Sequence, residues 1–148
     1  MRLLPTVLVL SLAACSSPAP TPAPTRTACG SPVDTGPLPQ WARGGFSGPT
    51  DMPHVLGDRG EIVGAVFGFP LSATPRPDRA NKILWVAKDA PPPGDLTIEA
   101  RLDGTTTSQT RQVPGGPGPS IVDLPAAGCW HLTLTWPAHT DTMDLVYN

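Results

Sequence analysis

Proline and glycine interrupt this chain so often that long helices are disfavoured. The 148 residues include 21 prolines and 15 glycines. A proline inside a helix removes a hydrogen bond and breaks the helix, and within sheets proline is confined to edges and turns. Threonine and valine are plentiful between these interruptions, and both favour strands. The chain is therefore predicted to be all-β, with short strands and many turns.

Runs that read as strands follow one another at turn spacing after residue 60. They span residues 61–69, 82–88, 95–102, 105–113, 120–124, 128–136 and 142–148. Asp103-Gly104 is a hairpin signal between two of these runs. No alternation of strands with helices is visible, which disfavours a parallel α/β fold. The pattern predicts an antiparallel β-sandwich of about seven strands. Residues 30–60 read as irregular, with Trp41 and Phe46 packing this segment onto the core.

The run at 128–136 shows the clearest two-residue period. One face carries large apolar side chains, and the other carries polar ones and a cysteine. The first face consists of Trp130, Leu132, Leu134 and Trp136, and the second of Cys129, His131, Thr133 and Thr135. Successive strand residues point to opposite faces, so the apolar set is predicted to face the core and Cys129 to point away from it.

The first residues have the plan of an export signal. Arg2 precedes a mostly apolar stretch at 3–14, which is too short for a membrane-spanning helix of ~20 residues. The stretch ends in Leu12-Ala13-Ala14-Cys15, which resembles a bacterial lipobox. The resemblance implies cleavage after residue 14 and attachment of diacylglycerol to Cys15. A plain secretory signal with a chance cysteine is the alternative.

Residues 15–28 follow as a lipidated cysteine and a disordered proline-rich tether. Segment 16–28 is rich in Ser, Pro, Ala and Thr and has no large apolar residue, so it is predicted to be extended. Residues 29–148 then form one domain. The predicted location is extracytoplasmic, with the chain anchored to the cell membrane by lipid on Cys15.

Two cysteines remain after Cys15. An even pair in an exported protein favours a disulfide, here between Cys29 and Cys129. Two unpaired buried thiols are the alternative. The predicted bridge would hold the end of the tether over the outside of a sheet.

Charge excludes one class of partner. Removal of residues 1–14 takes away Arg2 and leaves 9 basic and 12 acidic residues, a formal net charge of −3. No basic stripe is present, so nucleic acid is not an expected partner.

Part of the predicted domain resembles the immunoglobulin-like domain of small, largely uncharacterised bacterial lipoproteins. The matching stretches are NKILWV, LTIEARLDG, LPAAGCWHLTLTW and MDLVY, between Asn81 and Tyr147. The resemblance covers roughly the last half of the chain together with the lipobox. It implies an immunoglobulin-like sandwich at the cell surface and a non-enzymatic role, and it supplies no catalytic residues.

Few residues suggest a metal-binding or catalytic role. Met52 and His54 offer soft ligands that suit copper, and Met143 is the only other methionine beyond the signal peptide. A copper-binding lipoprotein is therefore an alternative function, and it predicts that these three side chains converge. No zinc motif or serine-nucleophile motif is present. No catalytic residue, metal site or cofactor is predicted, and a cell-wall-associated enzyme would need a deep pocket with a histidine–carboxylate pair.

The four tryptophans divide into two pairs. Trp85 and Trp130 are predicted in the core, whereas Trp41 and Trp136 are candidates for an exposed binding surface. Burial of all four is the alternative. The sequence thus predicts a non-catalytic interaction module of the cell envelope. Its expected partner, besides the membrane that holds the anchor, is an envelope protein or a cell-wall component.

Overall fold

The structure is a computed structural model that describes residues 30–148. The predicted signal peptide and tether, with Cys15 and Cys29, lie outside the described residues. The elements in chain order are the 3₁₀ turn η1 (Gln40–Ala42) and the strands β1 (His54–Leu56), β2 (Ile62–Val66), β3 (Lys82–Ala87), β4 (Leu96–Leu102), β5 (Ser108–Val113), β6 (Pro119–Ile121), β7 (Gly128–Trp136) and β8 (His139–Tyr147).

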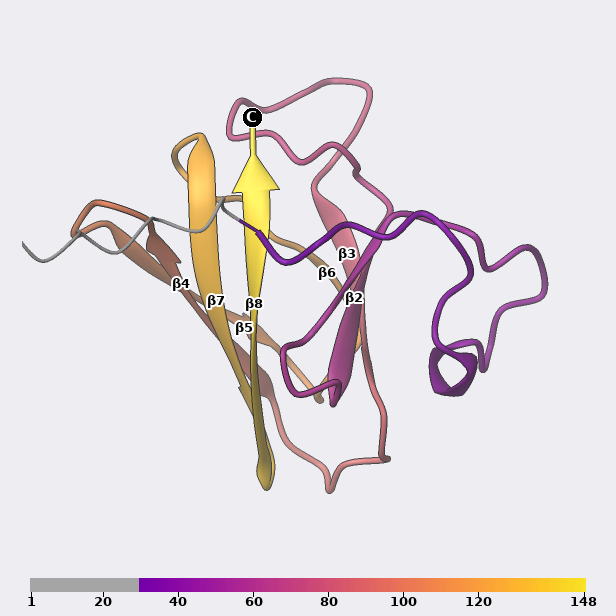
Figure 1. The fold of residues 1–148 in the computed structure, drawn as a ribbon. Coiled ribbons are helices and arrows are strands. Elements are labelled where there is room, and N and C mark those ends of the chain that lie inside the picture. The colour runs from indigo at the N-terminus through magenta and orange to yellow at the C-terminus, as the bar shows by residue number, and fades with distance from the viewer. Residues whose placement is uncertain (1–29) are drawn as a thin grey trace, which may run out of the picture.

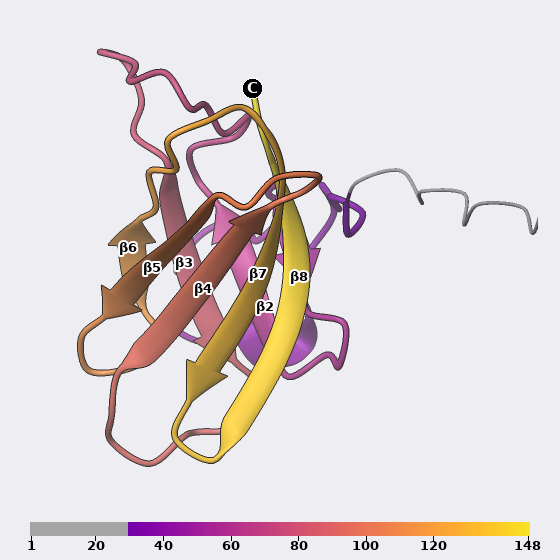
Figure 2. The same ribbon diagram turned by 90° about the vertical axis from the view of Figure 1, so that its left-hand side faces the viewer.

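These strands form two antiparallel sheets that face each other. One sheet has the order β1-β2-β3-β6 and the other β5-β4-β7-β8, and Figures 1 and 2 show the two layers from the side and from the front. The chain passes between the sheets after β3, β5 and β6. Such crossings are typical of immunoglobulin-like sandwiches. The predicted all-β antiparallel sandwich is confirmed.

Strand periodicity explains how the sheets enclose the core. In β7 and β8 every second residue is buried, and the buried hydrophobic residues of both strands pack in one cluster between the sheets. Trp130 and Leu132 of β7 pair with Leu145 and Met143 of β8 in register. The predicted apolar face of 128–136 is confirmed, and His131 is exposed on the opposite face.

A second, smaller apolar cluster covers the outer face of the other sheet. All five residues of β2 are buried, because residues 38–52 lie over the side of the sheet that faces away from β7. Leu38 and Ala42 pack there against Val63 and Ala65, with Trp41 and Phe46 at the margin. The expected packing role of Trp41 and Phe46 is correct, although they contact this outer cluster rather than the core between the sheets.

Residues 30–60 are more regular than expected. Residues 54–56 form β1, which pairs with β2, so the sandwich has eight strands instead of about seven. Four further boundaries differ by three residues from the prediction: β2 ends at Val66, β5 begins at Ser108, β6 ends at Ile121 and β8 begins at His139. The hairpin at Asp103-Gly104 is confirmed, since β4 and β5 pair antiparallel on either side of it.

Candidate functional site

The segment before β1 builds a pocket against the edge of the sheet. The backbones of Asp34 and His54 exchange two hydrogen bonds of 2.9 and 2.8 Å, and Leu38 N–H donates to the carbonyl of Thr50 at 3.0 Å. These bonds hold residues 34–38 beside β1. The prolines between them donate no backbone hydrogen bond, so this stretch makes isolated bridges instead of a continuous strand.

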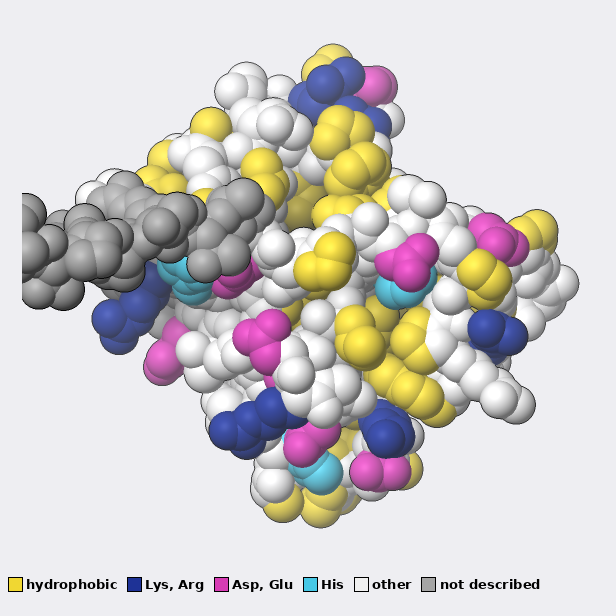
Figure 3. Space-filling view, in the orientation of Figure 1, with side chains coloured by type: hydrophobic (Ala, Val, Ile, Leu, Met, Phe, Trp, Pro, Cys, Tyr) yellow, Lys and Arg dark blue, Asp and Glu magenta, His cyan; other side chains and the backbone are white. Residues whose placement is uncertain are grey.

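The pocket has a volume of about 360 Å³. Its walls combine proline and leucine side chains with three polar groups, and the complete lining is Pro32, Asp34, Pro37, Leu38, Pro39, Arg43, His54 and Leu56. Figure 3 shows this side of the molecule, where hydrophobic side chains lie beside a histidine and an acidic side chain. An apolar hollow with a few polar groups is the usual form of a small-ligand site.

His54 is the most buried polar residue of the pocket, at 4% exposure. Its Nδ1 lies 2.9 Å from the carbonyl oxygen of Met52. A carbonyl only accepts, so Nδ1 carries the proton. Within residues 30–148, Nε2 of His54 has no hydrogen-bond partner.

Asp34 and Arg43 are each held by one hydrogen bond and keep polar atoms uncommitted. Oδ1 of Asp34 accepts the N–H of Gly36 at 2.7 Å. Nε of Arg43 donates to the carbonyl of Leu38 at 2.7 Å. In the described part of the chain, Oδ2 of Asp34 and the two terminal nitrogens of Arg43 have no further partner. The pocket therefore offers two hydrogen-bond acceptors, Nε2 of His54 and Oδ2 of Asp34. It also offers one cationic donor group, the two terminal nitrogens of the Arg43 guanidinium.

A second group of polar side chains lies on the outer face of β7 and β8. His131 Nδ1 lies 2.6 Å from Oδ1 of Asp144, and its Nε2 lies 3.6 Å from Oδ1 of Asp103. The hydrogen bond to Asp144 and the charges of both carboxylates raise the pKa of His131. His131 is thus a proton-binding link between β8 and the turn after β4.

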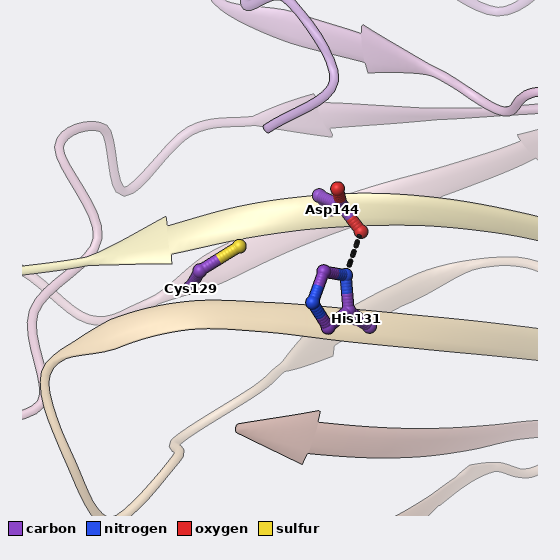
Figure 4. A group of neighbouring side chains, drawn as sticks. All are labelled: Cys129, His131 and Asp144. Carbon is purple, nitrogen blue, oxygen red and sulfur yellow. Dashed lines mark hydrogen bonds and ion pairs between the residues drawn. The ribbon is translucent and has the colours of Figure 1, made fainter. Parts of the chain in front are cut away.

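Figure 4 shows Cys129 beside this pair. Ligand atoms of Cys129, His131 and Asp144 lie within 4.8 Å of one another, a spacing that a metal ion could bridge. Cys129 already takes part in another interaction, however, so its sulfur is not available as a ligand. As predicted, Cys129 points away from the core between the sheets.

A third histidine lies where the β7–β8 hairpin turns. His139 stacks on Trp136 with ring centroids 5.3 Å apart, and its Nδ1 lies 3.1 Å from Oε2 of Glu61. Neither this histidine–carboxylate pair nor that of His131 is among the lining residues of three pockets found in residues 30–148. A cell-wall enzyme is expected to have a deep pocket with such a pair, and the pocket beside β1 does contain one histidine and one aspartate, His54 and Asp34.

The side chains of the copper hypothesis lie in different layers. Met143 is buried in the core between the sheets, whereas Met52 packs in the outer cluster. His54 lines the pocket beside β1. The structure therefore does not bring Met52, His54 and Met143 together.

The tryptophans do not form an exposed surface. Trp85 and Trp130 are buried as predicted, and their Nε1 atoms donate to Ser120 Oγ and Ala126 O at 2.9 Å. Trp136 is only 3% exposed, so this candidate for an exposed surface is buried, in agreement with the alternative that all four tryptophans are buried. Its even spacing from Trp130 and Leu134, six and two residues, already placed it on the core face. Trp41 is half-buried in the outer cluster.

Sequence reasoning missed the pocket. It singled out His54 for its closeness to Met52, and it did not single out Asp34. Arg43 carried no signal at all, because its role depends on how residues 32–43 fold back onto β1.

Among residues 30–148, no helix is long and apolar enough to cross a membrane. No protein-family model, curated protein or solved structure matches this chain.

Proposed function

We propose that this chain is a lipoprotein anchored outside the cytoplasmic membrane by lipid on Cys15, and that its sandwich is a non-catalytic binding module of the cell envelope. The lipobox-like Leu12-Ala13-Ala14-Cys15 and the proline-rich segment 16–28 support the anchor. Two or more acyl chains hold a protein stably on a membrane.

The observation that carries the binding role is the pocket beside β1. Its lining combines proline and leucine walls with an imidazole, a carboxylate and a guanidinium. Such a set can recognise a ligand through hydrogen bonds and charge. We therefore favour a binding role, with a component of the envelope or the cell wall as partner.

We further infer that Cys29 pairs with Cys129, which would fix the end of the tether to β7. A Cβ at Gly30 would lie 3.9 Å from Cγ2 of Val146, and Val146 is the register partner of Cys129. The N–H of Asp144 donates to Ser31 Oγ at 2.9 Å. Residues 30 and 31 thus run along β8, and residue 29 is one Cα step of ~3.8 Å away.

The anchor is tested by growing cells that express the chain with a labelled fatty acid. We expect label on the wild-type protein and on Cys129→Ser, and none on Cys15→Ser. Membrane fractionation should find the wild type and Cys129→Ser with the membranes and Cys15→Ser in the soluble fraction. Label on Cys15→Ser, or a wild-type protein found only in the soluble fraction, would refute the anchor. Crosslinking on intact cells then identifies the envelope partner.

A further inference from the structure

We propose that the pocket beside β1 binds a small organic carboxylate that carries a hydrogen-bond donor on an apolar body. The free end of a short peptide and an N-acylated amino acid both have this chemistry. The inference rests on the binding role proposed above and names the class of ligand.

The size of the pocket limits the part of a ligand that it can enclose. Small-molecule sites range over ~300–1,000 Å³, so a volume of about 360 Å³ lies near the lower end. Pro37, Pro39, Leu38 and Leu56 provide rigid apolar walls. A compact aliphatic group fits such walls, and a large aromatic cofactor does not.

The free acceptor atom of His54 requires a hydrogen-bond donor on the ligand. The Nδ1–H of His54 is committed to the carbonyl of Met52, so a neutral imidazole presents Nε2 as an acceptor. His54 is 4% exposed overall, and its Nε2 atom, which has no hydrogen-bond partner within residues 30–148, can accept a hydrogen bond from a ligand. Oδ2 of Asp34 is a second acceptor on the same lining. An amide N–H or an ammonium group satisfies these atoms.

The guanidinium of Arg43 requires an anionic hydrogen-bond acceptor on the ligand. The bond from Nε to the carbonyl of Leu38 holds the guanidinium against the pocket wall. Its terminal nitrogens can then bind a carboxylate through two parallel hydrogen bonds. The lining carries only one cationic side chain, and Asp34 opposes it. A singly charged carboxylate therefore suits the pocket better than a phosphate.

The test titrates the full chain, purified in mild detergent, with N-acetyl-leucine and follows backbone amide signals by NMR. Two analogues each lack one feature: N-acetyl-leucinamide has no carboxylate, and 4-methylpentanoate has no amide N–H. We expect N-acetyl-leucine to shift signals of residues 32–56 and each analogue to bind about tenfold more weakly or worse.

The peptide N-acetyl-alanyl-alanyl-leucine distinguishes the two possible sources of the ligand, the end of a peptide and a free N-acylated amino acid. Tighter binding of the peptide indicates a peptide end, and weaker binding indicates a free acid.

Two variants assign the contacts. Arg43→Gln should weaken N-acetyl-leucine about tenfold and leave the binding of N-acetyl-leucinamide unchanged. His54→Asn removes Nε2, while its amide can still donate to the carbonyl of Met52, and it should weaken N-acetyl-leucine but not 4-methylpentanoate. Arg76→Gln, an exposed arginine outside the pocket, is the matched control and should bind like the wild type.

Three results would overturn the inference. They are no shift around the pocket at 10 mM N-acetyl-leucine, equal binding of the acid and its amide, or full affinity in Arg43→Gln. Fatty-acid labelling of Cys15 does not depend on the pocket. A failed titration with intact labelling would therefore reject the ligand class and leave the anchored module standing.

Discussion

At the scale of single residues, Asp141 holds the turn between β1 and β2 in place. It is fully buried, and its carboxylate accepts three backbone N–H groups: Arg59 and Thr142 at 2.8 Å and Glu61 at 3.0 Å. No basic side chain pairs with it among the described residues. The turn thus depends on a buried charge that only backbone donors stabilise.

Replacement of Asp141 should therefore cost much stability. Asp141→Ala leaves three N–H groups without their acceptor, and each buried unsatisfied group costs about 1–3 kcal/mol. We expect the free energy of unfolding, measured by urea denaturation, to fall by about 3 kcal/mol or more. Asp58→Ala removes an exposed carboxylate with one bond to Thr142 Oγ1 and should cost less than about 1 kcal/mol. Similar losses in both variants would contradict this role for Asp141.

Gly57 is required by the same contact. A Cβ at Gly57 would lie 2.2 Å from Oδ2 of Asp141, whereas a Cβ at Gly48 would meet no atom within 4 Å. Overpacking a rigid site costs about 1–3 kcal/mol, so Gly57→Ala should lower the unfolding free energy by that amount and Gly48→Ala should not lower it. In an Asp141→Ala background the cost of Gly57→Ala should shrink. An unchanged cost there would show that another neighbour causes the clash.

At the scale of elements, His131 links three parts of the sheet. It lies on β7 opposite Arg101 of β4, bonds to Asp144 of β8, and lies near Asp103 in the turn after β4. The carboxylates raise its pKa above 6.5 in the folded protein. The folded state therefore binds this proton more tightly than the unfolded chain does. The resulting stabilisation is complete below about pH 6.5 and is lost as the pH rises through the raised pKa.

This linkage predicts a pH-dependent effect of His131→Gln. Because His131 is half exposed, solvent screening limits the effect to about 1 kcal/mol or less. The variant should be less stable than the wild type between pH 5 and 6.5, and the two should converge at higher pH. Asp144→Asn should flatten the decline of wild-type stability that begins above about pH 6.5. Parallel stability profiles of the wild type and His131→Gln in urea denaturation would exclude the linkage.

The elements that could be predicted from the sequence are those whose pattern is local. The alternation at 128–136 correctly placed Trp130 in the core, and Asp103-Gly104 correctly placed a hairpin. β1 was missed because three residues between prolines and glycines show no period, and β2 supplies the pairing that makes them a strand. The pocket was missed for the same reason. Asp34, Arg43 and His54 come together only when the preceding segment folds back on the sheet.

At the scale of the whole molecule, the bridge proposed between Cys29 and Cys129 would join the end of the tether to the last hairpin. The loop it closes spans about a hundred residues, and the chain-entropy model gives ~4–5 kcal/mol for a loop of that length. Strain and residual structure in the unfolded chain reduce such values, so we expect a loss of about 2–5 kcal/mol when the bridge is removed. Because residues 30 and 31 lie along β8, the loss should be accompanied by release of this segment.

Cys129→Ser tests this directly by urea denaturation of the oxidised protein, with Cys15→Ser as the matched control. We expect a loss of about 2–5 kcal/mol in Cys129→Ser and none in Cys15→Ser. Peptide mapping without reductant should recover Cys29 and Cys129 in one linked species. Amide exchange at Gly30 and Ser31 should accelerate in Cys129→Ser, while the exchange of Leu132 and Leu134 should rise only as far as the lower global stability requires. Equal stability of both variants, or a map that shows both thiols free, would mean that packing of residues 30–53 alone fixes the tether to the sandwich.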